Sequence, residues 1–251
     1  MKFWRDVSGA VAISDVVAEV LDARMVAWTR NKDLEEMIKK KNKKLLYVVN
    51  KTDLVSKKTL ESIKRELGWN KTVFVSAREN LGMNLLKTKL LIEKKRSDRD
   101  EFHVSFVGYP NVGKSSVINA LGKRAKTKTS KKSGTTRGIQ WVSVSGMKVL
   151  DSPGVIPIED KDVVRLVLIG AKSTSKVRDV ELIAYEIIKL FQKRNLGALR
   201  KHYGIQFDGD TEHILLRIGV KKNLLLKKGI IDERRAALLI IQDWQKGRLS
   251  L

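Results

Sequence analysis

The sequence of 251 residues contains no cysteine, three histidines, three prolines and few aromatic residues, 6% of the total. The absence of cysteine excludes disulfides, cysteine-ligated zinc, iron–sulfur clusters and thiol nucleophiles, and it fits a reducing cytoplasm. Three scattered histidines are too few for a zinc hydrolase. No apolar run approaches the ~20 residues that a membrane-spanning helix needs. We therefore expect a cytoplasmic protein with no transmembrane segment and no metal cluster.

Acidic residues are also scarce relative to basic ones. The chain has 51 Lys and Arg against 28 Asp and Glu, a formal net charge of +23. Lysine-rich surfaces of thermophile proteins are usually balanced by glutamate in ion-pair networks, and this chain is not balanced. The excess favours a polyanionic partner, which could be RNA, DNA or an anionic membrane surface.

Short β-branched runs alternate with helix-like segments over the first two thirds of the chain. Such runs predict strands of a parallel sheet covered on both faces, and the alternation predicts a doubly wound α/β fold. A hairpin turning at Ser145-Gly146 is expected to add an antiparallel edge. The expected strands are Val16–Leu21, Leu45–Val49, Val73–Val75, His103–Val107 and Val149–Leu150, and the expected helices are Lys32–Lys40, Lys57–Leu67, Asn84–Lys94 and Ser115–Leu121.

From about residue 174 the pattern becomes helical. Val177–Gln192 and Asp232–Trp244 carry apolar residues at the 3.6-residue period of an amphipathic helix. No strand signal in this part is strong enough to extend the sheet. We therefore expect two domains, residues 1–173 with the sheet and residues 174–251 as a small, mainly helical, basic domain.

The segment Gly108–Ser115 has the spacing G-x4-G-K-S between an expected strand and an expected helix, which is typical of a phosphate-binding loop. Backbone N–H groups at such a helix start bind phosphate oxygens. Lys114 would reach the β- and γ-phosphates, and the Ser115 hydroxyl would ligate Mg²⁺. The alternative is a glycine-rich turn before a helix, which the flanking strand and helix disfavour. The expected phosphate-binding residues are Asn111, Val112, Gly113, Lys114, Ser115 and Ser116.

The segment Asp151-Ser-Pro-Gly154 follows another expected strand. Asp151 would hold Mg²⁺ through a water, and the Gly154 amide would meet a γ-phosphate, so that the next loop senses the nucleotide. The same tetrapeptide is also an ordinary turn sequence. Its position 38 residues after Gly113, with a hairpin between, is that of a P-loop GTPase.

Two further polar segments, Asn50-Lys51-Thr52-Asp53 and Ser76-Ala77, each follow an expected strand. The Asp53 carboxylate can accept from guanine N1 and N2, a donor pair that adenine lacks. Asn50 would contact guanine N7 and support the loop, Lys51 would stack under the base, and the Ala77 amide would meet guanine O6. A polar helix cap after a strand is the alternative reading of NKTD, which the second element disfavours.

A basic segment, residues 123–137, joins the phosphate loop to the hairpin and contains no acidic residue. In a GTPase a threonine here completes the Mg²⁺ shell, and Thr136 is the expected residue, with Thr135 as the alternative. The segment is also expected to be a mobile loop that binds phosphates. Each basic residue is a candidate phosphate contact or a solvated charge. The candidates for RNA binding are Lys126, Lys128, Lys131, Lys132, Lys193, Arg194, Arg200 and Lys201.

The guanine elements precede the phosphate loop, whereas GTPases ordinarily begin with the phosphate loop. The order NKTD, SA, GYPNVGKS, GTT and DSPG resembles the circularly permuted GTPases of ribosome assembly, the YlqF/YawG family. The resemblance covers essentially the whole chain and includes Trp4, Asp15 and Asp22-Ala23-Arg24. The family usually continues this last segment with a residue and a proline, where this chain has Met25-Val26.

The resemblance implies a GTP hydrolase that uses GTP, GDP and Mg²⁺ and acts on the precursor of the large ribosomal subunit. It also implies a helical C-terminal domain that binds rRNA, and a K⁺ ion held beside the phosphates by Asn111. The expected catalytic residues are Lys114, Asn111 and Thr136. No glutamine follows Gly154 to orient water, so we expect slow intrinsic hydrolysis that the ribosomal particle and K⁺ stimulate.

Two alternatives remain open from the sequence. One is a GTPase switch that acts on another RNA or at an anionic membrane surface. The other is a non-catalytic RNA-binding protein with a relic nucleotide fold, against which the intact Lys114, Ser115, Asp53 and Asp151 argue. A monomer is expected in either case.

Overall fold

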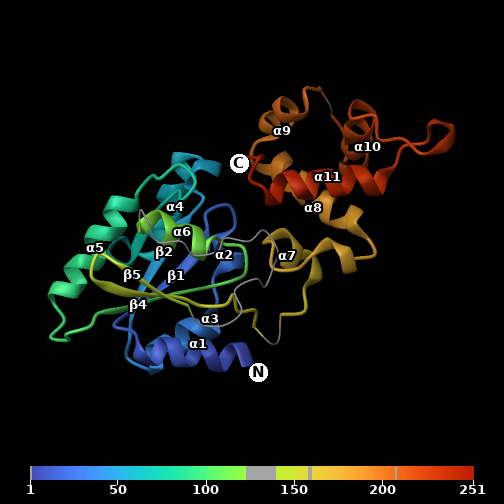
Figure 1. Cartoon of the computed structure of the whole chain (residues 1–251). Coiled ribbons are helices and arrows are strands. Elements are labelled where there is room, and N and C mark those ends of the chain that lie inside the picture. Colours follow the sequence, from blue (N-terminus) through green and yellow to red (C-terminus); the bar gives the residue numbers. More distant parts are fainter. Residues whose placement is uncertain (1, 123–139, 158–159, 207) are drawn as a thin grey trace. The chain divides into compact units, whose positions relative to one another are not determined.

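The computed structural model describes residues 2–122, 140–157, 160–206 and 208–251. The chain divides into two compact units, Met1–Lys161 and Asp162–Leu251 (Figure 1). The sequence pattern predicts a later boundary, at residue 173. Helix α7 (Val163–Leu168) belongs to the second unit because it packs on other helices there, and its Leu168 carbonyl accepts the Trp244 indole N–H at 2.8 Å.

The first unit is built on a six-stranded sheet in the order β3-β2-β1-β4-β6-β5. Five strands are mutually parallel, and β5 runs antiparallel to β6 at the edge. This confirms the predicted doubly wound, mostly parallel sheet and its hairpin edge. The strands are β1 (Val16–Asp22), β2 (Lys44–Asn50), β3 (Thr72–Phe74), β4 (His103–Val107), β5 (Gln140–Val144) and β6 (Met147–Asp151).

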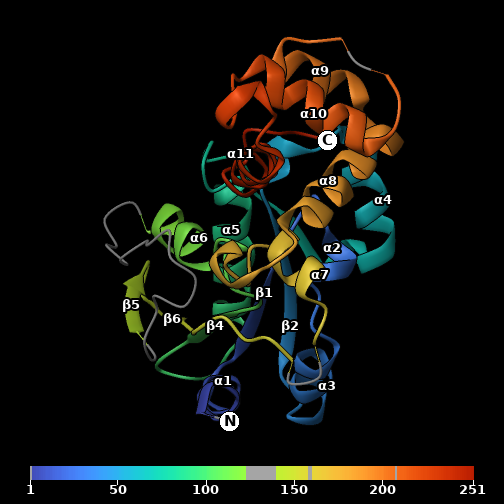
Figure 2. The ribbon, with the colours of Figure 1, turned by 90° about the vertical axis from the view of Figure 1, so that its right-hand side faces the viewer.

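Helices cover both faces of this sheet. Figure 2 shows α5 and α6 on one side of β1 and β2, and α4 on the other. Polar side chains cap the first turns of two helices. Asn31 accepts from the Leu34 N–H at the start of α3, and Ser56 accepts from the Thr59 N–H at the start of α4. Gly68, at φ 87°, ends α4. The helices are α1 (Lys2–Ile13), α2 (Val26–Thr29), α3 (Lys32–Lys40), α4 (Lys57–Leu67), α5 (Met83–Lys95) and α6 (Lys114–Leu121).

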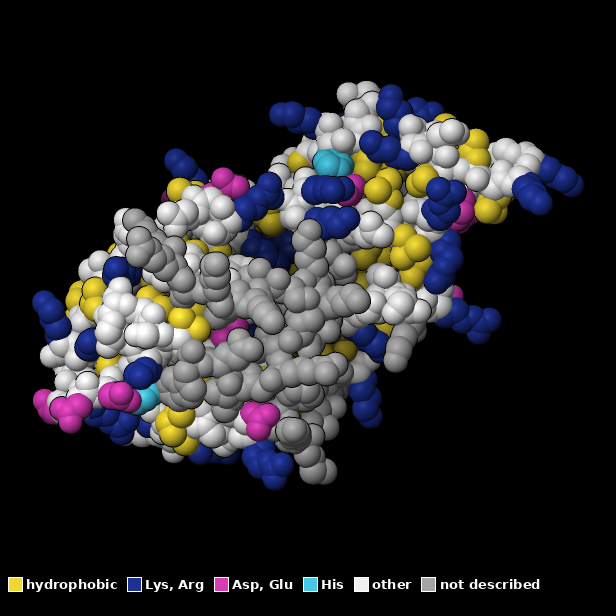
Figure 3. All heavy atoms as spheres, in the orientation of Figure 1, with side chains coloured by type: hydrophobic (Ala, Val, Ile, Leu, Met, Phe, Trp, Pro, Cys, Tyr) yellow, Lys and Arg dark blue, Asp and Glu magenta, His cyan; other side chains and the backbone are white. Residues whose placement is uncertain are grey.

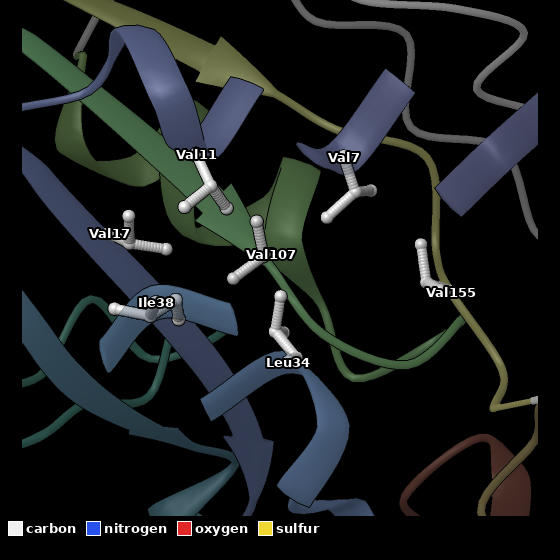
Figure 4. Close-up of a cluster of buried hydrophobic side chains, with 7 residues drawn as sticks. All are labelled: Val7, Val11, Val17, Leu34, Ile38, Val107 and Val155. Atoms are coloured by element: carbon white, nitrogen blue, oxygen red, sulfur yellow. The ribbon is translucent and has the colours of Figure 1, made fainter. Parts of the chain in front are cut away.

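One apolar cluster joins α1, α3, β1 and β4 to the chain that follows β6 (Figure 4). Val107 is the last residue of β4, directly before the glycine-rich loop, and Val155 directly follows the DSPG segment. Trp4 packs against the same cluster, and its indole N–H donates to the Ile156 carbonyl at 3.2 Å. The core therefore anchors one end of each loop. The cluster consists of Val7, Val11, Val17, Leu34, Ile38, Val107 and Val155.

The second unit is helical, as expected for the C-terminal part. The predicted apolar face of α8 is buried, and Phe191 on it meets Trp244 of α11 edge to face, with ring centroids 6.1 Å apart. Besides α7, its helices are α8 (Val180–Arg194), α9 (Leu196–Tyr203), α10 (Thr211–Lys221) and α11 (Glu233–Gln245). Within the described residues, no helix is long and apolar enough to cross a membrane.

A buried carboxyl group interrupts the apolar run of β1. Glu19 is fully buried, and its Oε1 accepts the Asn31 N–H at 2.8 Å, whereas Oε2 has no partner among the described residues. Burial raises the pKa of Glu19 from 4.5 to about 8, and the Asn31 hydrogen bond partly opposes that rise. Between these two values the folded protein holds a proton that the unfolded chain releases. Stability therefore falls as the pH rises through this range.

We predict that Glu19→Gln removes this loss of stability with rising pH. Relative to the variant, the wild type should lose up to ~5 kcal/mol of unfolding free energy between pH 4.5 and 8, at about 1.4 kcal/mol per pKa unit. Urea unfolding at a series of pH values measures the difference. Glu36→Gln, at an exposed position of α3, serves as the control and should keep the wild-type profile. Parallel profiles for the wild type and Glu19→Gln would contradict the assignment.

Candidate nucleotide-binding site

The motif segments meet at one edge of the sheet, because each follows the carboxyl end of a parallel strand. Asp22, the last residue of β1, is paired in register with Asn50, the last residue of β2. Phe106 of β4 is paired with Asp151 at the end of β6. Segments that are up to a hundred residues apart in sequence therefore form one site.

The glycine-rich loop runs between β4 and α6, and its backbone requires glycine at both ends. Gly108 has φ 132°, and a Cβ there would lie 2.6 Å from the Val20 carbonyl oxygen. Gly113 has φ 100°, and a Cβ there would lie 2.3 Å from Asn50 Nδ2. Asn111 is exposed, with φ 61°. This loop geometry turns the start of α6 toward the sheet edge, as expected for phosphate binding.

Lys114 is buried, and its ammonium donates to loop carbonyls, Gly108 O at 3.1 Å and Tyr109 O at 2.8 Å. Burial lowers its pKa from 10.5 to about 8, and Asp151 opposes that shift. An anion bound in the loop would stabilise the ammonium form and raise the pKa again. The site is thus electrostatically suited to a phosphate group.

Ser115 and Asp151 place two potential metal-ligand oxygens side by side. The Ser115 hydroxyl donates to Asp151 Oδ2 at 2.5 Å, and Asp151 Oδ1 is buried without a partner among the described residues. Burial raises the pKa of Asp151, and the Ser115 hydrogen bond and the Lys114 charge oppose that rise. Hydroxyl and carboxylate oxygens are ligands that Mg²⁺ takes, and the unpartnered oxygen could accept a hydrogen bond from a metal-bound water. These residues therefore fit a Mg²⁺ ion, whereas Thr136 lies outside the described residues.

The DSPG segment lies directly against the glycine-rich loop. The Ser152 hydroxyl donates to the Phe106 carbonyl at 2.8 Å, and the Val155 N–H donates to the Gly108 carbonyl at 3.2 Å. A Cβ on Gly154 would lie 2.6 Å from the Pro110 nitrogen. Only glycine permits this approach, so Gly154 reaches the loop that the sequence analysis assigns to the phosphates.

Asn50 joins the NKTD segment to both neighbouring loops. Its buried side-chain amide donates from Nδ2 to the Val112 carbonyl at 3.0 Å, and its Oδ1 accepts the Ala77 N–H at 3.1 Å. Asn50 therefore links the glycine-rich loop to the Ser76-Ala77 loop. The Ala77 amide, which we expect at guanine O6, donates to Asn50 in this structure. Ser76 is buried, and its Oγ accepts the Glu79 N–H at 3.1 Å.

Asp53 lies in a short 3₁₀ turn, Thr52–Leu54, and its Oδ1 is buried without a hydrogen-bond partner among the described residues. An unsatisfied buried oxygen costs of the order of 1–3 kcal/mol. The N1–H and N2–H groups of a guanine would satisfy it. Asp53 therefore has the free acceptor that guanine recognition needs.

The segment Asp22-Ala23-Arg24 has no role predicted from the sequence, and in the structure its Asp22 contacts the NKTD segment. Lys51 has φ 63°, and its ammonium donates to Asp22 Oδ2 at 2.8 Å and to the Asn111 carbonyl at 3.0 Å. No spacing rule predicts this long-range contact. An acidic residue at the end of a strand that neighbours the NKTD strand is the only signal.

The candidate RNA-binding residues that the structure describes lie on consecutive helices of the second unit. Lys193 and Arg194 end α8, and Arg200 and Lys201 lie on α9, where Arg200 forms an ion pair with Asp208. Figure 3 shows Lys and Arg side chains gathered over these helices. The other candidates, Lys126, Lys128, Lys131 and Lys132, lie outside the described residues.

Comparison with known proteins gives consistent matches. Residues 103–202 match the family described as 50S ribosome-binding GTPase. An uncharacterized GTP-binding protein of Methanocaldococcus jannaschii is 41% identical over 94% of this chain and 63% of its own length. GTPase grn1 of Schizosaccharomyces pombe is 31% identical over 96% of this chain and 59% of its own length. The chain thus spans less than two thirds of the length of these two relatives.

A solved structure extends the comparison to the fold. GNP-bound YlqF from T. maritima superposes with a TM-score of 0.62 and 25% identity, over 99% of this chain and 95% of that one. The match therefore includes both units of the chain.

We predict that Gly113→Ala weakens binding of a fluorescent GDP analogue at least tenfold. The added methyl group would collide with the Asn50 amide and move the loop N–H groups away from the phosphates. Equilibrium titration measures the affinity. Gly68→Ala is the control, because Gly68 also has a positive φ but no atom within 4 Å of the added Cβ. Unchanged affinity in Gly113→Ala would show that the close approach is not needed for binding.

Proposed function

Since the chain belongs to the circularly permuted GTPases of the YlqF/YawG family, we propose that it binds and hydrolyses GTP during assembly of the large ribosomal subunit. One observation carries the nucleotide part of the proposal. Among the described residues, two buried carboxylate oxygens, Asp53 Oδ1 and Asp151 Oδ1, have no hydrogen-bond partner. Asp53 lies in the turn after β2 and Asp151 ends β6, on the two sides of the glycine-rich loop that Asn50 contacts. These oxygens fit the two ends of a guanine nucleotide, the base and the phosphate-bound metal.

At the base, Asp53 accepts the guanine N1–H and N2–H groups. The stem of Lys51 lies under the base, and Ser76 and Ala77 form the opposite loop, where an amide meets guanine O6. Asn50 holds this loop against the phosphate loop through its two amide hydrogen bonds. Adenine has no donor pair for Asp53, so an adenine nucleotide leaves the carboxylate unsatisfied and binds far more weakly.

At the phosphates, the N–H groups of the loop from Asn111 to Ser116 bind the oxygens, and Lys114 exchanges its loop carbonyls for the β- and γ-phosphates. Ser115 would hold Mg²⁺ directly, Asp151 would hold it through a water, and Thr136 would complete the shell. The ion, when bound, neutralises charge on the β- and γ-phosphates. The Gly154 amide donates to the γ-phosphate and so reports its presence.

Hydrolysis is slow in the isolated protein, because the chain lacks a water-orienting glutamine after Gly154. Val155 occupies that place and is buried in the core. We propose that the exposed carboxamide of Asn111 holds a K⁺ ion, whose charge offsets that of the transition state. The ribosomal particle supplies the remaining stimulation.

The ribosomal partner rests on relationship and charge. The matched family is described as ribosome-binding, and other relatives are nucleolar GTP-binding proteins. A net charge of +23 suits rRNA, and the candidate contacts are the basic residues already named on α8, on α9 and in the 123–137 segment. We propose a cytoplasmic monomer that changes its rRNA contacts between the GTP and GDP states. An action on another RNA, or at an anionic membrane, is the alternative.

The proposal predicts that GTP turnover by the purified chain rises at least tenfold with large ribosomal subunits, and more in KCl than in NaCl. Phosphate release measures turnover, with small subunits, bare RNA and anionic vesicles as controls. Stimulation by vesicles or unrelated RNA alone would favour the alternative. Absence of turnover with every addition would refute the catalytic part.

A second prediction concerns the choice of base. In Asp53→Asn, an amide replaces the carboxylate and presents one donor and one acceptor, which match xanthine in place of guanine. GDP affinity should fall roughly 100-fold or more, and XDP should become the better ligand. Competition against a fluorescent nucleotide measures both affinities. Asp98→Asn, at an exposed position of the loop after α5, should bind GDP as the wild type does. Retained preference for GDP in Asp53→Asn would refute the role of Asp53.

A further inference from the structure

A buried ion pair lies at the carboxyl end of β1, and the proposed function assigns it no role. Asp22 is fully buried and Arg24 is 3% exposed. Asp22 Oδ1 accepts the backbone N–H of Arg24 at 3.1 Å and its Nε at 3.0 Å, and Oδ2 accepts a terminal guanidinium N–H at 2.8 Å. The two side chains therefore form a rigid, forked pair. The Asp22 N–H donates to the Thr29 hydroxyl at 3.1 Å, which fixes the backbone as well.

Lys51 of the NKTD segment completes this network. Its ammonium binds the same Asp22 Oδ2 at 2.8 Å and the Asn111 carbonyl of the phosphate loop at 3.0 Å. The backbone adds a parallel link, since the Ala23 N–H donates to the Asn50 carbonyl at 2.9 Å. The buried Asp22 carboxylate thus contacts the Lys51 ammonium. This ammonium links the NKTD segment (the base loop) to the glycine-rich loop (the phosphate loop).

The electrostatics show that each charge depends on the others. Burial lowers the pKa of Lys51, and Asp22 opposes that shift. Burial alone would raise the pKa of Asp22, but Arg24 and Lys51 hold it well below its usual range. Asp22 therefore stays ionised at physiological pH and keeps the Lys51 ammonium charged and oriented. Its removal would leave two poorly solvated cations without their shared partner.

We propose that Asp22 is a positioning residue for nucleotide binding. Asp22 acts through Lys51 to hold the base loop and the phosphate loop at a fixed spacing, and Arg24 orients the Asp22 carboxylate. The inference rests on the proposed function, since it assumes that both loops contact one guanine nucleotide. Asp22 itself touches no part of the ligand. A nucleotide has a fixed distance between its base and its phosphates, so preset loops bind it without the cost of ordering them.

The test is a double-mutant cycle in the full chain, with Asp22→Asn, Lys51→Met and the double variant, read out as the Kd of fluorescent GDP. Methionine keeps the apolar stem of Lys51 but removes the charge. Each single change should raise Kd about tenfold, and the double variant should be no more than about twofold weaker than the worse single one. For GTP turnover by Asp22→Asn, KM should rise while kcat stays within about threefold.

A product of the two single effects, about 100-fold, in the double variant would overturn the proposal, because it would mean that Asp22 acts independently of Lys51. Unchanged affinity in folded Asp22→Asn would overturn it as well. Asp15→Asn is the matched control, because Asp15 precedes the same strand, pairs with Arg99 and accepts the His103 N–H. It should bind GDP as the wild type does.

Two further outcomes concern the folding of Asp22→Asn and the absence of turnover in the wild type. If Asp22→Asn does not fold, the double variant Asp22→Asn/Arg24→Gln removes the charges of both partners and should show the same tenfold loss, whereas wild-type affinity would overturn the proposal. Wild-type protein that binds GDP but has no turnover would refute the proposed hydrolysis and leave this inference standing. Equal GDP binding by the wild type and Asp22→Asn would refute the inference alone.

Discussion

Parallel pairing of β1 with β2, and of β4 with β6, is the constraint on which the rest of the structure depends. It brings the carboxyl ends of four strands to one edge, with Asp22 beside Asn50 and Phe106 beside Asp151. The order in which the chain visits these strands does not matter to the site. A permuted chain therefore forms the same edge as long as each loop stays attached to its own strand. The connections only need to supply helices for both faces.

Beyond the apolar cluster that anchors Val107 and Val155, a few polar contacts hold the loops at this edge together. Asn50 binds the phosphate loop and the Ser76-Ala77 loop, and Lys51 binds the phosphate loop and Asp22. Such contacts cost free energy when one partner is missing. Charges that remain incompletely compensated, on Lys114 and Asp151, stand where a phosphate and a metal would compensate them. The arrangement is thus preorganised for a charged ligand.

The strands and several helices could be predicted because their signals are local. Uninterrupted β-branched runs mark strands that are buried on both faces, and α3 and α4 have the predicted bounds, Lys32–Lys40 and Lys57–Leu67. The sequence pattern did not predict helices α1, α2, α7, α9 and α10. Three of these, α2, α7 and α9, have eight residues or fewer, which is too short to show a clear 3.6-residue period. The motif spacing predicted which loops meet at the site. It could not predict the contact of Lys51 with Asp22, because that contact follows from strand register and not from any spacing along the chain.

The burial of Val155 determines the free-energy cost of any movement of Gly154. Gly154 contacts Pro110, and the next residue is buried in the cluster with α1 and α3, while Trp4 holds the carbonyl of Ile156. A shift of Gly154 toward a γ-phosphate must carry this anchored segment with it or strain the bonds between. Exposing a valine side chain costs about 1.5–3 kcal/mol, which is comparable to a charge-assisted hydrogen bond from an amide to a phosphate. If the proposed contact of Gly154 with a γ-phosphate forms, the two positions of this segment would be close enough in free energy for one phosphate group to decide between them. In the proposed switch, a shift at Gly154 would be passed to the second unit through the chain itself, because that unit begins at Asp162.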